Sequence, residues 1–147
     1  MAQCKTSPEV GGMGHSVKRK EDPRFIRGQG NYVDDVVRPG MVFMDIVRSP
    51  YAHAKIKSIN TEKALAHPGV AAVITGETLK EYNLHMMPTL MSDTQMVLPI
   101  EKVCYQAQEV AAVIATDRYS AADGVELVEV EYEPLPVVVD PHKATDP

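Results

Sequence analysis

The sequence predicts an α+β domain in which two main helices pack on one mixed β-sheet. Apolar and alternating segments are separated by helix-forming segments, in the order strand, helix, strand, then strand, helix, strand again. The composition agrees, since 44% of the 147 residues are hydrophobic and 24% are charged, as in globular proteins. A chain of this length buries one core. We therefore expect one domain over residues 13–141, with a flexible tail at 1–12 and the start of a linker at 142–147.

The first strands follow a stretch of irregular chain and turns at 13–35. Residues 41–49 alternate, so that Val42, Met44 and Ile46 share one face of a strand. Residues 52–59 predict a second strand, or a continuation of the first one, whose solvent-exposed face carries lysines. Asn60 or Thr61 is a suitable N-cap for a short helix over 62–66.

Two apolar runs with nearly the same sequence, VAAVIT at 70–75 and VAAVIA at 110–115, predict strands at the centre of the sheet. Continuous apolar runs are typical of strands that are buried on both faces. Thr75 is placed to cap a helix that ends at Tyr82. Between the two runs we expect a long ordered loop at 83–99 and a short strand at 103–105.

The strongest helix signal lies over 118–127, with Thr116 or Asp117 as its N-cap. Gly124 inside this helix costs about 1 kcal/mol relative to Ala, which suggests that a neighbour requires the missing side chain. Residues 128–133 alternate valine or tyrosine with glutamate, as a half-buried strand does. Residues 137–140 predict a final edge strand, where the preceding prolines are tolerated.

Charge and cysteine content exclude several classes of protein. A net charge of −5 argues against a nucleic-acid-binding protein, and the basic residues at 18–20 with Arg24 and Arg27 are interpreted as a solvated or interface segment. Cys4 and Cys104 alone form no disulfide framework. We find no secretory signal and no apolar run of about 20 residues that would cross a bilayer, so a cytoplasmic location is expected.

Two short motifs resemble binding or catalytic signatures. Gly28-Gln-Gly30 resembles the start of a dinucleotide-binding fingerprint, but the third glycine, the preceding strand and the following helix are missing. We interpret it as a glycine turn. Asp34 and Asp35 are adjacent, and adjacent side chains on extended chain point in opposite directions, so we interpret them as a turn or strand-entry pair.

Metal-binding and nucleophilic residues are scattered. The histidines at 15, 53, 67, 85 and 142 have no ligand spacing, while His85 with methionines 86, 87, 91 and 96 leaves open a soft copper(I) site. Core filling by methionine is the commoner use of such residues. Cys104 lacks an identifiable base and is interpreted as a buried or half-buried structural cysteine. No catalytic, cofactor-binding or metal-binding residue is therefore predicted in this chain.

Four segments together resemble one family: GQGNYVDD (28–35), VRSPYAHAKIKSIN (47–60), HPGVAAVIT (67–75) and QEVAAVIATDRYSAADGVELVEVEYEPLPVVVDP (108–141). They are similar to the N-terminal α/β hammerhead domain of the molybdenum-binding large subunit of xanthine dehydrogenase and aldehyde oxidase-type enzymes. The loop LHMMPTLMSDTQMVL (84–98) is most similar to the carbon monoxide dehydrogenase-like branch.

The resemblance implies a multisubunit enzyme whose substrate the sequence leaves open among carbon monoxide, aldehydes and N-heterocycles. Its large subunit would hold molybdopterin cytosine dinucleotide, and partner subunits would hold two [2Fe–2S] clusters and FAD. The family's catalytic residues have no counterpart in this chain, so the resemblance implies a non-catalytic structural and subunit-docking domain, cut from a longer polypeptide or encoded separately. The second hypothesis is a free-standing binding or self-associating module with a methionine-rich loop. A homodimer through uncovered strand edges is compatible with either.

Overall fold

The computed structural model describes residues 19–87 and 95–144, and the chain divides into two compact units, Met1–Pro39 and Gly40–Pro147. The described part of the first unit contains a short helix, α1 (Asp22–Phe25), and a 3₁₀ turn, η1 (Val33–Asp35). The rings of Phe25 and Tyr32 stack with their centroids 5.2 Å apart. The described part of the first unit is thus organised around one aromatic pair.

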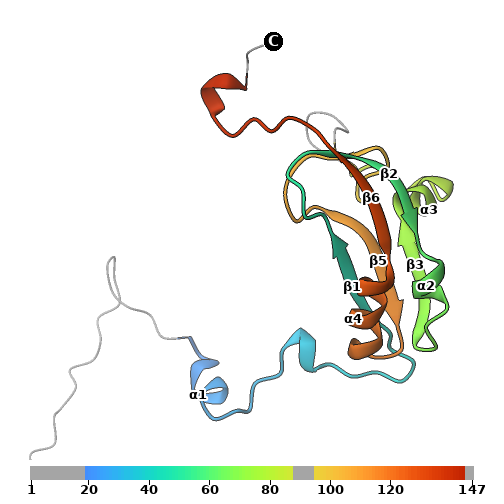
Figure 1. Ribbon diagram of the computed structural model, residues 1–147. Coiled ribbons are helices and arrows are strands. Elements are labelled where there is room, and N and C mark those ends of the chain that lie inside the picture. Colours follow the sequence, from blue (N-terminus) through green and yellow to red (C-terminus); the bar gives the residue numbers. More distant parts are fainter. Residues whose placement is uncertain (1–18, 88–94, 145–147) are drawn as a thin grey trace, which may run out of the picture. The chain divides into compact units, whose positions relative to one another are not determined.

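The second unit contains two three-stranded antiparallel sheets (Figure 1). Sheet A has the strand order β1 (Phe43–Arg48), β5 (Glu109–Ala115), β3 (Val70–Thr75), and sheet B has the order β4 (Lys102–Val103), β2 (Ala54–Asn60), β6 (Glu129–Pro134). The α+β class is confirmed, whereas the single mixed sheet is wrong. A strand pattern specifies which residues face the core but not which strand is the partner.

Four helical segments complete the second unit: α2 (Glu62–Leu65), α3 (Gly76–Glu81), α4 (Arg118–Leu127) and the 3₁₀ turn η2 (Pro141–Lys143). Figure 1 shows α4 lying against sheet A. The predicted caps are confirmed for α3 and α4, because Thr75 Oγ1 accepts from the Thr78 amide and Asp117 Oδ1 accepts from the Ser120 amide at 2.9 Å. At α2, Asn60 Oδ1 accepts from the Glu62 amide at 3.0 Å.

The core forms two neighbouring clusters that both include residues of β5. Val113 and Ala111 of β5 pack with Val47, Ala64 and Val128, all of them buried. Val110 packs with Ala54 and Val103, which belong to sheet B. A register shift opposite Val47 and Arg48 accompanies this change from one cluster to the other. The central strand therefore connects the cores of both sheets.

The two apolar runs do not have equivalent positions. β5 is the central, largely buried strand of sheet A, as predicted. β3 is an edge strand, and its residues are half-buried apart from the exposed Ala71, so the prediction of a second sheet-centre strand is wrong. Two nearly identical apolar segments do not show which strand lies at the centre of the sheet and which at its edge, because helices can cover part of an edge strand.

The predicted last strand at 137–140 is also wrong. These residues form no strand, and Val137, Val138 and Val139 are 52%, 62% and 88% exposed. Two prolines, Pro134 and Pro136, immediately precede them and lack the amide hydrogens that a ladder needs. Residues 128–133, in contrast, alternate as predicted, with Val130 and Tyr132 half-buried and the glutamates exposed.

Candidate functional site

A network of hydrogen bonds begins where β1 ends, at Arg48. Arg48 Nη1 donates to the Ala107 carbonyl at 2.9 Å and to Glu109 Oε1 at 2.6 Å. Ser49 is buried, and its amide donates to the Gln108 carbonyl while its own carbonyl accepts from the Ala107 amide, both at 2.9 Å. Ala107 has a positive φ of 63°, a conformation that costs a non-glycine residue roughly 1–2 kcal/mol. The network therefore holds the 104–108 turn in a conformation that the turn alone would not favour.

The same segment fixes the chain that follows β6. His53 Nδ1 lies 2.7 Å from the Pro136 carbonyl, which only accepts, so the ring must carry its proton on Nδ1. The Leu135 amide donates to the His53 carbonyl at 2.9 Å. Nearby, the rings of Tyr51 and Tyr132 lie 5.3 Å apart at 57°. Residues 48–53 thus connect the end of β1, the 104–108 turn and the C-terminal segment.

Two hollows open at this end of the unit. The larger, here called the C-terminal cleft, is about 480 Å³ and is lined by Ala52, His53, Cys104, Tyr105, Gln106 and residues 136–139. Its neighbour is about 320 Å³ and shares Cys104 and Tyr105. The exposed valines at 137–139 give the C-terminal cleft a largely apolar wall. Such a wall suits a protein partner better than a small polar substrate.

Cys104 is exposed, which corrects the prediction of a buried or half-buried cysteine. β4 is only two residues long, and its Val103 fills the core position. Because successive side chains of an extended chain alternate, the next residue points away from the core. The Cys104 amide donates to Gln108 Oε1 at 2.6 Å, which ties the backbone to the turn.

Three titratable groups of this end, Glu109, Tyr105 and Tyr132, have pKa values that keep them in their ordinary charge states at neutral pH. A hydrogen bond from its own backbone amide and the Arg48 guanidinium lower the pKa of Glu109. Burial and the Glu109 carboxylate raise the pKa of Tyr105, and burial raises the pKa of Tyr132. A charged carboxylate and neutral phenols are poor general acids and bases at neutral pH. These three side chains are therefore poorly suited to proton transfer at neutral pH.

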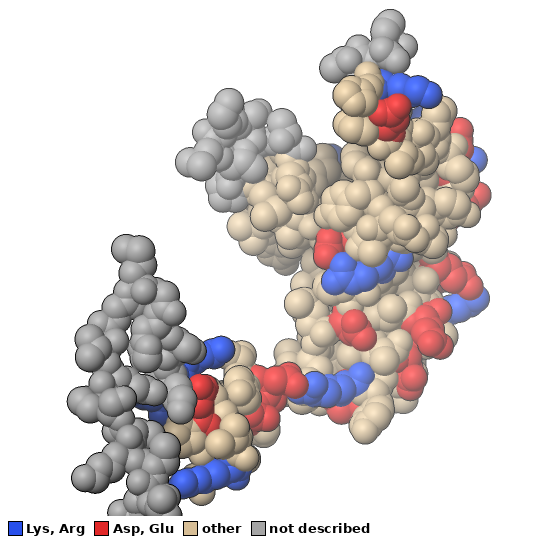
Figure 2. Space-filling model, turned by 90° about the vertical axis from the view of Figure 1, so that its left-hand side faces the viewer, with Lys and Arg blue, Asp and Glu red and all other residues tan. Residues whose placement is uncertain are grey.

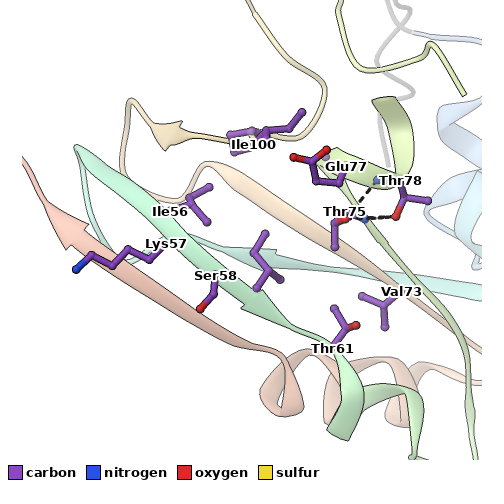
Figure 3. A pocket seen from close by; sticks show the side chains of 12 residues that line it. Ile56, Lys57, Ser58, Thr61, Val73, Thr75, Glu77, Thr78 and Ile100 are labelled. Carbon is purple, nitrogen blue, oxygen red and sulfur yellow. Dashed lines mark hydrogen bonds between the residues drawn. The ribbon is translucent and has the colours of Figure 1, made fainter. Parts of the chain in front are cut away.

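A third hollow, of about 370 Å³, lies between β2 and β3 (Figure 3). Ile56, Ile59 and Val73 line it together with the hydroxyls of Ser58 and Thr75. Thr75 and Thr78 are engaged with each other at the start of α3, as the dashed line in Figure 3 shows. The Lys57 ammonium lies 3.5 Å from Glu133. Thr75, Thr78 and Lys57 thus already have partners in the fold.

The glycine and aspartate motifs of the first unit are turns, as interpreted from the sequence. Gly28 has a φ of +69°, and a Cβ on Gly30 would lie 2.8 Å from the Phe25 ring. Asp35 Oδ2 accepts a hydrogen bond from the Tyr32 amide at 2.9 Å at the start of η1. Asp34 also interacts with a neighbouring group. The glycines serve the local turn, and in the part of the first unit that the structure describes no strand–turn–helix arrangement surrounds them.

The candidate metal ligands form no cluster among the residues that the structure describes. Within 19–87 and 95–144, no three residues among His, Cys, Asp and Glu lie close enough together to hold a metal ion. Met86 and Met96 face each other across an isolated antiparallel bridge, but Met91 lies outside the described residues. The copper(I) hypothesis and the prediction of no catalytic, cofactor or metal residue both stay predictions. Among the described residues, none of the helices is long and apolar enough for a membrane span.

Comparison with known proteins identifies the class. Residues 27–136 match the family model of the aldehyde oxidase and xanthine dehydrogenase a/b hammerhead domain, so the chain belongs to this family. Within it, the chain is 65% identical over 136 residues to the carbon monoxide dehydrogenase large chain of Afipia carboxidovorans and 59% identical over 138 residues to that of Hydrogenophaga pseudoflava. These alignments cover 92% and 94% of the chain.

A solved structure agrees with this assignment. Reconstituted CO dehydrogenase from Oligotropha carboxidovorans superposes with a TM-score of 0.83 at 65% identity over 92% of the chain. The chain spans only 17% of that structure's matched chain and 17% of the two large-chain relatives. The hammerhead fold and the relation to carbon monoxide dehydrogenase large chains, both expected from the sequence, are confirmed.

The sequence reasoning from individual residues gave no role to Arg48, Ser49 or His53. These residues lie inside the segment VRSPYAHAKIKSIN that carried the family resemblance. A signal was available, since a positive charge and a hydroxyl follow an apolar strand just before a proline. That pattern indicates a strand end whose side chains are free to bond to a neighbouring turn.

Proposed function

We propose that this chain is the non-catalytic structural and docking domain of a molybdenum hydroxylase large subunit similar to carbon monoxide dehydrogenase. The observation that carries the proposal is the 65% identity over 92% of the chain to a large chain of which it spans only 17%. The role fits the apolar C-terminal cleft, whose wall of exposed valines offers a surface for more protein.

The molybdenum cofactor is proposed to lie in another part of the large subunit. When bound there, molybdopterin cytosine dinucleotide would supply the redox chemistry, and partner subunits with [2Fe–2S] clusters and FAD would carry the electrons. The described residues of this chain do not fit such a cofactor, since Cys104 and Tyr105 line an open cleft and the polar groups around them bond to the turn.

The chain's own residues are proposed to set the direction in which the polypeptide leaves the domain. His53 and Arg48 hold the C-terminal segment and the 104–108 turn to the end of β1. Fixed exit geometry matters because a shift of about 1 Å at a distant support can lower the rate of a catalysed reaction about 100-fold.

The test compares two preparations. The isolated chain is purified and analysed for molybdenum and for organic cofactor. In parallel, the matching segment of the Afipia carboxidovorans large chain is replaced by this chain, and oxidation of carbon monoxide is measured for the assembled chimaera. We expect no cofactor in the isolated chain and activity in the chimaera.

A matched pair of variants refines the test. His53→Ala should lower activity of the chimaera, because Pro136 loses its donor, whereas Leu65→Ala on exposed α2 should not. Stoichiometric molybdopterin or oxidase activity in the isolated chain would rule out the non-catalytic role.

A further inference from the structure

The two faces of sheet A differ in what covers them. The inner face carries Val47, Ala111 and Val113 and packs against buried residues of α2 and of the chain at the end of α4. The antiparallel register shows which residues lie on the opposite, outer face. Met44 lies opposite Ile114, and Ile46 lies opposite Ala112. On the other side of β5, Ala72 of β3 lies opposite Ile114 and Ile74 lies opposite Ala112, so both belong to the same outer face.

This outer face is entirely apolar, and part of it lies in solvent. Met44 is 64% exposed, and Val42, which precedes β1 on the same face, is 52% exposed. Ile46, Ile114, Ala72 and Ile74 are half-buried. The ion pair between Arg48 and Glu109 marks one end of the face. Figure 2, which looks at the side on which β1 lies in Figure 1, shows broad uncharged areas between isolated charged groups.

The free edge of β1 is a less suitable surface than this face. β1 has β5 as its one partner in the described residues, so its other edge is open. The Ile46 amide, however, donates to Asp45 Oδ1 at 2.7 Å. An incoming strand would have to displace that carboxylate, and charged side chains on an edge disfavour strand addition. Contact is therefore expected through the side chains of the face.

We propose that the outer face of sheet A (Val42, Met44, Ile46, Ala72, Ala112, Ile114 and Ile74) packs against the remaining part of the large subunit. A sheet face made of apolar side chains is stable when it is buried against another layer of structure. The large-chain relatives supply that layer, since the matched segment is 17% of their length. This inference rests on the proposed function and assigns the docking surface within it.

The first experiment measures solvent access at Met44. Met44→Cys is made in a background of Cys104→Ser and Cys4→Ser, in the isolated chain and in the Afipia carboxidovorans chimaera. The matched control is Tyr119→Cys, since Tyr119 is 84% exposed on α4. Maleimide labelling is followed at each peptide by mass spectrometry.

We expect both cysteines to react quickly in the isolated chain. In the chimaera, labelling of Met44→Cys should slow about tenfold or more, because it then requires local opening of the interface, while Tyr119→Cys keeps its rate. Equal rates at Met44→Cys in both preparations would overturn the assignment of this face.

A second measurement does not depend on a folded chimaera. The chain and the Afipia carboxidovorans large chain without its matching segment are co-expressed as separate polypeptides and purified through a tag on one of them. Met44→Asp should abolish co-purification, and Tyr119→Asp should not.

The outcomes separate the two proposals. If the unaltered chain does not co-purify, the docking role itself fails and the inference fails with it. If the unaltered chain and Met44→Asp both co-purify, the docking role stands and only the assignment of the outer face is wrong.

Discussion

Gly124 illustrates how one missing side chain sets the packing of α4 on sheet A. A Cβ at this position would lie 2.7 Å from Val113 Cγ1 and 2.8 Å from Val70 Cγ2. These neighbours belong to β5 and β3, so neither can move without disturbing a strand. The suggestion that a neighbour requires the missing side chain is confirmed.

We predict that Gly124→Ala destabilises the protein although alanine is the better helix former. Overpacking costs roughly 1–3 kcal/mol, which exceeds the gain of about 1 kcal/mol in helix propensity. Urea unfolding followed by circular dichroism measures the difference. Ala122→Gly, at an exposed position of the same helix, is the control and should cost about 1 kcal/mol. A more stable Gly124→Ala variant would contradict the close packing.

Asp117 links the stability of α4 to pH. Hydrogen bonds from the Ser120 amide and hydroxyl lower the pKa of its carboxyl below the ordinary value. A lowered pKa in the folded state means that the carboxylate stabilises the fold above the unfolded-state pKa of about 4. This contribution is lost as the pH falls through the folded-state value.

We therefore predict that Asp117→Asn loses less stability at acid pH than the original chain does. Asparagine is also a good N-cap, so the variant should keep the helix near neutral pH. Thermal unfolding midpoints measured between pH 7 and pH 2 should fall less in the variant than in the original chain. Parallel curves for the two proteins would show that this carboxylate does not contribute to acid sensitivity.

At the scale of elements, the open edge of β1 is protected by one acidic side chain. Asp45 places a charge on the edge and accepts from the Ile46 amide. Removing it leaves an edge strand whose remaining residues are apolar up to Arg48, and such an edge pairs more readily with other copies.

We predict that Asp45→Val makes the chain self-associate in proportion to its concentration, as measured by sedimentation velocity. The control is Glu126→Val, which makes the same kind of change, from an acidic residue to valine, at an exposed position of α4 away from any sheet edge. This variant should keep the oligomeric state of the original chain. Association of both variants to the same extent would point to general loss of charge.

The elements that the sequence could predict are those with a local cause. The alternation at 128–133 and the capping aspartate at 117 act within a few residues, and both are confirmed. The division into two sheets depends on pairings between distant segments, such as Arg48 with Glu109, which no local pattern contains. The burial of Cys104 was predicted wrongly for the same reason, since β4 ends at Val103, two residues earlier than the predicted strand at 103–105.

At the scale of the whole molecule, the second unit contains both core clusters within itself. We predict that deleting residues 1–39 leaves the thermal unfolding midpoint of the second unit unchanged, as measured by calorimetry. A matched deletion of residues 134–147 removes Pro136, the partner of His53, and should lower that midpoint. A lower midpoint after the N-terminal deletion would show that the first unit contributes to the stability of the second.

The central position of β5 also determines when this domain can fold during its synthesis. β1 and β3 both pair with β5, and β2 makes most of its strand pairing with β6. Both partner strands lie much later in the sequence. The apolar strands β1 and β3 are therefore synthesised without a partner until the codons of β5 have been translated. Such nascent segments are prone to aggregate and are the kind that chaperones bind. The yield of folded protein should thus depend on how fast the ribosome reaches the codons of β5 and β6.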